Sequence, residues 1–229
     1  MDANTYERLK ENYEEVAVIE QVNNTQSKRF YKILKRVIDI ILSFIGLIIL
    51  SPVFLIVAIA IKFDSKGPVF FAHSRLGKDG KMIKIYKFRT MCEHAEDMIK
   101  DFTEEQKKEF KQNYKLSNDP RITKVGKILR KTSIDEIPQM INILKGDLSI
   151  VGPRPIIEEE IEKYGPNRTK FLSVKPGLTG YWQANGRSNT TYEDRIKMEL
   201  YYVDNMSFWL DIKIFFKTIL VVLKKDGAV

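Results

Sequence analysis

The sequence predicts an α+β fold that is mostly helical. It comprises an N-terminal re-entrant membrane segment of helix, break and helix, a small cytoplasmic domain with a β-hairpin, and interfacial amphipathic helices. Three observations predict this fold: residues 37–61 are apolar except for Asp39, two β-rich runs flank a Gly-Lys-Asp-Gly turn, and most other segments carry charges at helical spacing. The predicted divisions are a polar tail at 1–29, a membrane hairpin at 30–62 and a membrane-associated cytoplasmic domain at 63–229.

The apolar segment 37–61 is long enough to cross a bilayer, because a hydrocarbon core of ~30 Å takes ~20 helical residues. Pro52 lacks a backbone donor and its ring clashes with the carbonyl four residues earlier, so we expect a kink or break at Ser51-Pro52. The Ser51 hydroxyl is expected to satisfy a backbone group that this break frees. The segment is therefore either a tilted, kinked single span or a helix that leaves the membrane by the face it entered.

Flanking charge favours re-entry. A spanning helix normally has Lys and Arg concentrated on its cytoplasmic side. Here basic residues occur on both sides, namely Lys28, Arg29, Lys32, Lys35 and Arg36 before the segment and Lys62, Lys66, Arg75, Lys78 and Lys81 after it. We therefore expect both ends to face the cytoplasm.

Composition narrows the function classes. The net charge of +8 suits anionic lipid, phosphate-bearing substrates or nucleic acid, and the membrane segment favours the first two, so no nucleic-acid partner is expected. Cys92 is the only cysteine, which excludes an intrachain disulfide and fits a reducing compartment. His73 and His94 are isolated, so we expect no zinc site.

The tail at 1–29 is polar and mixed in charge, and it is expected to be a disordered or partner-binding segment with at most a short helix near 6–18 and a linker at 23–25. After the membrane segment, β-rich runs at 69–73 and 82–88 flank the turn and predict a hairpin. Lys87 and Arg89 lie in the run IYKFRTM, where contact with phosphate or a lipid head group is as good an interpretation as a solvated basic face.

Residues 92–116 alternate in charge, which is typical of a solvated surface helix with pairs such as Glu104–Lys108. A short basic helix at 124–132 is expected to carry Arg130. Near the other end, 192–203 is predicted to be helical. Residues 207–225 are apolar with spaced lysines and Asp211, which favours a helix lying in the membrane interface, with a buried core helix as the alternative.

Asp135 and Glu136 have two interpretations. Ser133 with Glu136 fits a capping box, and Asp135 itself suits a helix cap with Pro138 in the first turn. In the other interpretation the acids belong to a phosphate site, because basic side chains bracket them in the sequence: Arg130, Lys131 and Arg154. Arg154 lies between two prolines, and its planar fork on a stiff loop suits bidentate contact with phosphate oxygens.

The stretch VKPGLTGYWQANGRS, from residue 174, predicts a tightly turned loop. Tyr181 and Trp182 offer faces on which a base or a sugar can stack, although an ordinary turn with an anchored aromatic is an equal alternative. Gln183 and Arg187 of this loop are candidate substrate-binding residues.

Taken together these stretches resemble the bacterial sugar transferases, small monotopic phosphoglycosyl transferases. The resemblance covers 30–227 and rests on Ser51-Pro52 in an apolar helix, IYKFRTM at 85–91, IDEIPQ at 134–139, VGPRP at 151–155 and PGLTGYWQANGR at 176–187. It implies a nucleophilic aspartate at Asp135 and a magnesium-associated glutamate at Glu136. It also implies substrate or phosphate contacts at Lys87, Arg130, Arg154 and Asp211, while Arg89 stays a candidate phosphate contact from its place in IYKFRTM.

The family's reaction would move a sugar-1-phosphate, with glucose or galactose expected, from a UDP-sugar to undecaprenyl phosphate, releasing UMP. It initiates capsule, exopolysaccharide or O-antigen synthesis at the cytoplasmic face of the bacterial inner membrane. A carboxylate with a pKa near ~4 attacks phosphorus without a general base, which predicts a covalent phosphosugar-aspartate. The alternatives are a direct ternary-complex transfer and a non-catalytic, membrane-anchored assembly subunit. Membrane lipids and a second copy in a homodimer are further expected partners.

Overall fold

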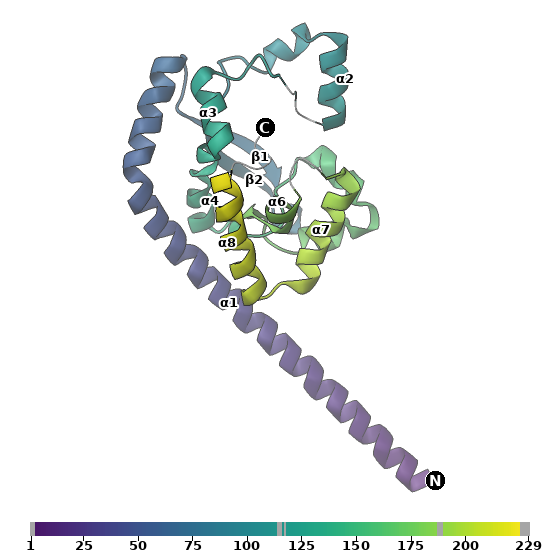
Figure 1. Cartoon of the computed structure of the whole chain (residues 1–229). Coiled ribbons are helices and arrows are strands. Elements are labelled where there is room, and N and C mark those ends of the chain that lie inside the picture. Colours follow the sequence, from purple (N-terminus) through teal and green to yellow (C-terminus); the bar gives the residue numbers. More distant parts are fainter. Residues whose placement is uncertain (1–2, 114–115, 117, 187–189, 225–229) are drawn as a thin grey trace. The chain divides into compact units, whose positions relative to one another are not determined.

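The computed structural model describes residues 3–113, 116, 118–186 and 190–224, with side chains from residue 29 onward except at 111–113 and 223–224. The chain divides into two compact units, 1–38 and 39–229, which are described separately. Helix α1 (Ala3–Asp64) supplies the described part of the first unit and begins the second (Figure 1). Both predicted boundaries, at 29 and at 62, fall within α1.

Helical structure in α1 continues without interruption through residues 23–25 and through Pro52. The predicted linker is therefore wrong: asparagine and threonine cost a helix only tenths of a kcal/mol each, and an existing helix propagates through them. The predicted break at Ser51-Pro52 is also absent, although Figure 1 shows α1 bending in its C-terminal half without folding back on itself.

Ser51 explains how the helix accommodates its proline. Pro52 has no N–H to donate to the carbonyl of Ile48, four residues earlier. The Ser51 hydroxyl donates to that same carbonyl at 2.8 Å. The expectation that Ser51 satisfies a freed backbone group is confirmed, and this hydrogen bond preserves helical structure where a break was predicted.

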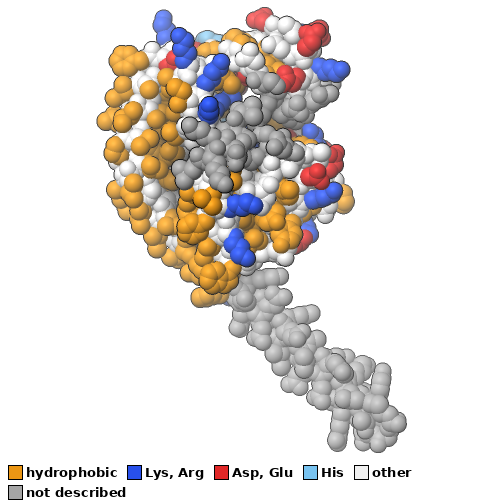
Figure 2. Space-filling model, in the orientation of Figure 1, with side chains coloured by type: hydrophobic (Ala, Val, Ile, Leu, Met, Phe, Trp, Pro, Cys, Tyr) orange, Lys and Arg blue, Asp and Glu red, His pale blue; other side chains and the backbone are white. Residues whose placement is uncertain are grey.

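The helix at 29–64 is long and apolar enough to cross a membrane, with a mean hydropathy of 3.0 in its most apolar window, and only 11% of that window is buried. Large apolar side chains project outward along it, including Ile49 at 68% and Ile56 at 66% exposure. Figure 2 shows hydrophobic side chains gathered along the edge that α1 forms in the second unit. This surface suits lipid better than water.

The β-hairpin is confirmed. Strands β1 (Phe70–Leu76) and β2 (Met82–Phe88) pair antiparallel, with Phe71 opposite Lys87 and Arg75 opposite Ile83. Because successive side chains on a strand alternate between faces, Arg75 and Lys87 lie on one face of the hairpin and Lys84 on the other.

The charged region at 92–116 is only partly as predicted. It contains a short 3-10 helix (Asp97–Asp101) and α2 (Glu104–Asn113), and Glu104 pairs with Lys107 at 2.9 Å, three residues on instead of four. Just after this region, the guanidinium of Arg121 pairs with Asp119 at 2.7 Å and lies over the ring of Phe102. The predicted basic helix is confirmed as α3 (Lys124–Thr132).

The rest of the domain consists of short helices and two three-residue strands that pair in parallel. In chain order these are a 3-10 helix (Ile134–Glu136), α4 (Gln139–Lys145), β3 (Ser149–Val151), a 3-10 helix (Glu158–Asn167), α5 (Arg168–Leu172), β4 (Gly177–Thr179), α6 (Tyr181–Asn185), α7 (Tyr192–Asn205) and α8 (Phe208–Lys224). The helix predicted at 192–203 is therefore confirmed as α7.

Helix α8 has two apolar sides. Ile214 is buried in a core cluster with Ile143, Leu148 and Tyr202, whereas Trp209 is 71% exposed and Phe216 is 60% exposed. The helix thus combines features of both predicted alternatives. One side completes the core, and the other presents apolar surface of the kind that an interface accepts.

Polar contacts fasten α1 to the domain within the second unit. Asp39 is buried, and its carboxylate accepts hydrogen bonds from the Ser149 hydroxyl at 2.8 Å and the Ile150 N–H at 3.0 Å, both on β3. At the end of the helix, Asp64 accepts from the N–H of Val125 at the start of α3. The single charge in the apolar segment is therefore an internal anchor.

Candidate active site

The acidic pair lies on the short 3-10 helix that follows α3. Ser133 ends α3 in a left-handed conformation with φ of 57°, and its N–H donates to the carbonyl of Arg130. Its side chain makes no capping bond to the 3-10 helix that it precedes, so the predicted capping box is wrong. The sharp change of direction instead brings Asp135 and Glu136 against the end of β2.

Lys87 connects the two acids. Its ammonium lies 2.6 Å from Glu136 Oε1 and 4.0 Å from Asp135 Oδ2. The side chain of Asp135 is 11% exposed and that of Glu136 is 25% exposed, so the ion pairs are only partly screened by water. The two adjacent carboxylates thus share the ammonium of Lys87.

Arg130 approaches from α3. Its Nε donates to the Thr90 hydroxyl at 2.9 Å, which fixes the guanidinium beside the acids. Burial lowers the pKa of Arg130, and the negative charge of Asp135 opposes that change. The structure therefore brings Lys87, Arg130, Asp135 and Glu136 together, as the sequence predicted.

Burial is the main electrostatic influence on Asp135. It raises the pKa of the carboxyl group from 3.8 to about 6; Glu136 raises it as well, while Lys87 and Arg130 lower it. At pH 7 about nine-tenths of the groups remain ionised. A buried carboxylate with few solvating waters and a raised pKa is a better nucleophile than an exposed one.

The two carboxylates suit Mg²⁺, although a complete metal cluster is not present among the described residues. Magnesium in phosphate-transfer sites is held by one or two protein carboxylates, and water and substrate phosphate supply the other ligands. Adjacent acids, of which Glu136 raises the pKa of Asp135, are a donor set of that kind. Glu136 is the more exposed of the pair and is the fitting ligand.

Arg154 is held by its backbone. Its N–H donates to Glu199 Oε1 at 3.1 Å, and Glu199 is fully buried on α7. Close backbone packing stiffens the loop further, since a Cβ on Gly152 would lie 2.6 Å from the carbonyl of Lys175. Among the described residues the guanidinium contacts only the ring of Trp182, at 5.8 Å, and pairs with no carboxylate.

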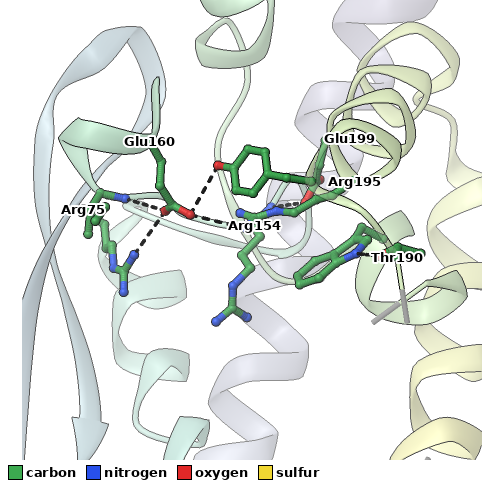
Figure 3. Close-up of polar contacts among 9 residues, drawn as sticks. Arg75, Arg154, Glu160, Thr190, Arg195 and Glu199 are labelled. Carbon is green, nitrogen blue, oxygen red and sulfur yellow. Dashed lines mark hydrogen bonds and ion pairs between the residues drawn. The ribbon is translucent and has the colours of Figure 1, made fainter. Parts of the chain in front are cut away.

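Glu160 organises a second polar cluster beside this loop (Figure 3). Its carboxylate lies 3.4 Å from Arg195 and 3.7 Å from Arg75, and it accepts a hydrogen bond from the Tyr192 hydroxyl. The Arg195 guanidinium also lies over the ring of Trp182 at 4.7 Å. In this arrangement a protein cation already contacts the Trp182 ring, which the sequence offered for stacking a base or sugar.

Burial raises the pKa of Glu199 to about 7, while Arg195 and the N–H of Arg154 lower it. Burial therefore favours the neutral form of this carboxyl group, which compensates the neighbouring guanidinium groups less than an exposed carboxylate would.

The other predicted site residues lie elsewhere. Arg89 is buried, and its guanidinium donates to the carbonyls of Lys66 and Ser65 just after α1, a structural role instead of the phosphate contact considered from sequence. Asp211 accepts from the hydroxyl of Tyr202 at 2.8 Å. Gln183 is half-buried on α6. Arg187 lies outside the described residues.

Sequence reasoning missed Glu160, Arg195 and Glu199. Glu160 belongs to an acidic run that reads as a solvated surface. Arg195, Glu199 and Tyr202 are buried on α7 at spacings of four and three, as expected for one face of a helix. Because that inward face is polar, nothing in the sequence indicated that it is buried.

Comparison with known proteins places this site in context. The bacterial sugar transferase family matches residues 30–225. The undecaprenyl-phosphate galactose phosphotransferase of Salmonella typhimurium is 43% identical over 211 residues, 91% of this chain and 44% of the relative. The exopolysaccharide production protein ExoY of Rhizobium meliloti is 41% identical over 197 residues, 85% of this chain and 87% of ExoY.

A further relative, the UDP-glucose:undecaprenyl-phosphate glucose-1-phosphate transferase of Escherichia coli, is 41% identical over 196 residues, 82% of this chain and 40% of that protein. The chain therefore spans less than half the length of the Salmonella and E. coli relatives and most of the length of ExoY.

Proposed function

Because this chain belongs to the bacterial sugar transferase family, we propose that it transfers a hexose-1-phosphate from a UDP-sugar to undecaprenyl phosphate and releases UMP. The names of the Salmonella and E. coli relatives, which specify galactose and glucose, support these hexoses as the sugar. The name of ExoY, an exopolysaccharide production protein, supports a role in exopolysaccharide synthesis, which we propose this transfer initiates.

The observation that carries this proposal is the buried Asp135 carboxylate held beside Lys87, Glu136 and Arg130. A nucleotide diphosphate is strongly anionic and repels a carboxylate nucleophile unless cations offset the charge. The ammonium of Lys87 and the guanidinium of Arg130 are positioned to do so while leaving Asp135 ionised at pH 7.

In the first step a carboxylate oxygen of Asp135 forms a bond to the β-phosphorus. The bond from that phosphorus to the bridging oxygen breaks, and its electron pair leaves with UMP. In the second step a phosphate oxygen of undecaprenyl phosphate attacks the same phosphorus and restores the Asp135 carboxylate. Neither step needs a general base, because both nucleophiles are already anionic at neutral pH.

Glu136 would hold Mg²⁺, which when bound would neutralise phosphate charge. Lys87 holds Glu136 in place through its 2.6 Å ion pair and lowers the pKa of Asp135. Thr90 orients Arg130 toward the acids. These contacts position the nucleophile before substrate binds, which lowers the entropic part of the barrier.

The proposed location is the cytoplasmic face of the bacterial inner membrane. A nucleotide sugar is soluble, whereas undecaprenyl phosphate carries its phosphate at the head-group layer, so the reactive carboxylate must lie near that surface. The exposed apolar side of α1 and the outer side of α8 support membrane association. A re-entrant path for α1 and a homodimer remain predictions.

The test uses the full chain in lipid nanodiscs with Mg²⁺ and a panel of UDP-sugars. We expect UMP release with one hexose, and a phosphosugar adduct on Asp135 detectable by intact mass before undecaprenyl phosphate is added. Asp135→Asn should abolish both, whereas a ternary-complex transferase would retain part of its rate. The mechanism is wrong if UMP release absolutely requires the lipid and no adduct forms.

A further inference from the structure

A row of basic side chains runs along one face of the hairpin. Lys87 lies opposite Phe71, and Arg75 follows four residues further along β1, so the two backbone positions are about 13 Å apart at ~3.3 Å per residue. His73 lies between them on the same face. Burial lowers the pKa of His73, and the positive charges of Arg75 and Lys87 lower it further, so both cations act on this position.

Arg75 ends this row beside Arg154. Burial and then the charge of Arg154 lower the pKa of Arg75 to about 10, while Glu160 and Glu136 oppose the change. Figure 3 shows the guanidinium groups of Arg75 and Arg154 on the same side of the Glu160 carboxylate. Arg75 therefore lies within electrostatic reach of both Arg154 and Glu136.

Positive charge exceeds negative charge at this end of the row. Glu160 is the carboxylate paired with Arg75, but at 3.7 Å the contact is longer than a hydrogen bond. The same carboxylate also pairs with Arg195 and accepts from the N–H of Ile157. Two half-buried guanidinium groups close together, with so little negative charge beside them, destabilise the folded protein unless an anion binds between them.

We propose that Arg75 is a substrate-binding residue which, with Arg154, clamps the phosphate that leaves with the nucleoside. This inference rests on the proposed function, because that reaction supplies the anion. Asp135 and Lys87 act at the phosphorus under attack, and the next phosphate of the diphosphate lies further along the row. As the bond to the bridging oxygen breaks, negative charge develops on that second phosphate, where forked guanidinium groups stabilise it.

Glu160 and Glu199 are positioning residues for this clamp. Glu160 pairs with the Arg75 side chain at 3.7 Å, and Glu199 holds the Arg154 backbone, so both arginines are placed near the clamp before the nucleotide arrives. Lys84 lies on the opposite face of the hairpin and Lys78 pairs with Asp79 in the turn, so neither of these lysines is placed for this contact.

The first experiment measures UMP binding by calorimetry, and steady-state kinetics, on the full chain in nanodiscs. Arg75→Gln should weaken UMP binding and lower kcat/KM for the UDP-sugar by about 10- to 100-fold, as expected for losing charge-assisted hydrogen bonds. Arg75→Lys, which keeps the charge and loses the fork, should recover part of this. The matched control Lys78→Gln removes the same charge from the same hairpin and should leave both values within about twofold.

A second experiment uses the unmodified chain and so does not depend on the folding of a variant. Phenylglyoxal labelling, mapped by mass spectrometry, should be blocked by UMP at Arg75 and Arg154 but not at Arg168, whose side chain is 59% exposed. The proposal is overturned if UMP fails to protect Arg75. It is also overturned if Arg75→Gln raises the KM for undecaprenyl phosphate and leaves UMP binding unchanged.

These readouts separate the inference from the proposed function. UMP binding needs no turnover, so a chain that binds UMP through Arg75 and transfers no sugar would contradict the proposed function and support the clamp. If Arg75→Gln transferred sugar at the unmodified rate, the result would support the proposed function and contradict the clamp.

Discussion

At the scale of single residues, the environment of Asp135 makes activity depend on pH. Its pKa of about 6 means that the nucleophile is increasingly protonated as pH falls below that value. We expect kcat/KM for the UDP-sugar to fall about tenfold per pH unit on the acid side of pH 6 and to level off above pH 7. Initial rates of UMP release, measured at fixed reaction times between pH 5 and 8, give this profile.

Variants on the two faces of β2 test the cause of that profile. Lys87 lowers the pKa of Asp135, so Lys87→Gln should move the acid limb, the fall of kcat/KM at low pH, to higher pH. The rate of this variant should partly recover at pH 8. Lys84→Gln removes a charge from the opposite face and should leave the limb in place. Equal limbs for both variants would contradict the assignment.

The same raised pKa predicts that Asp135 costs stability. Because the folded-state pKa lies above the unfolded value, the stability that protonated Asp135 contributes is complete below about pH 4 and is lost as pH rises through 6. At pH 7 the cost is at most about 3 kcal/mol. Asp135→Asn should therefore raise the Tm at pH 7 by several degrees while abolishing transfer, and a lower Tm would instead favour a structural role for Asp135.

Several residue roles were readable from the sequence, and others were not. The order of the motifs in the sequence predicted that Asp135, Glu136, Lys87 and Arg130 belong to one site. Arg75 was recognisable as basic, and only the register of the hairpin shows that it shares a face with Lys87. Arg89 looked like Lys87 in sequence, yet it lies beyond the strand end and binds backbone carbonyls.

At the scale of elements, the hairpin and α3 were predictable because their signals, turn residues between β-rich runs and a short basic segment, are local. Whether the helix breaks at Ser51-Pro52 was not predictable, because it depends on one side-chain rotamer. The Ser51 hydroxyl reaches the carbonyl that proline leaves without a partner, and the helix continues. The polar inner face of α7 was equally hidden, since buried Arg195 and Glu199 look like solvated residues until a neighbouring element covers them.

Asp39 shows how one element depends on another. Asp39→Asn retains one acceptor but places an amide donor against the donors of β3, which should cost about 1–3 kcal/mol and several degrees of Tm. Thermal unfolding in nanodiscs measures this loss. The control Asp79→Asn removes a charge from an exposed turn position with φ of 57°, which asparagine tolerates, and should leave the Tm unchanged.

At the scale of the whole molecule, the path of α1 through the membrane is the main open prediction. The apolar segment 37–61 has 25 residues and would be ~38 Å long if straight, beyond a ~30 Å hydrocarbon core. A segment of that length either crosses the membrane at a tilt or enters and leaves by the same leaflet. Flanking charge favours the second, with both ends in the cytoplasm.

Cysteine labelling decides between these paths. In a Cys92→Ser background, Lys28→Cys and Lys66→Cys should both react with a membrane-impermeant maleimide in inverted vesicles and resist it in spheroplasts. Reaction of the two positions from opposite sides would establish a single span and refute re-entry.

The anchor at Asp39 has a consequence for the lipid environment. Because Asp39 ties α1 to β3 and Asp64 ties it to α3, residues 39–64 of α1 and the domain respond to the bilayer as a single body. A change in acyl-chain length then cannot be absorbed by sliding the helix, and it must tilt the whole domain. Membrane thickness would thereby set how far Asp135 lies from the lipid phosphate, so that transfer rate varies with the chain length of the surrounding lipids.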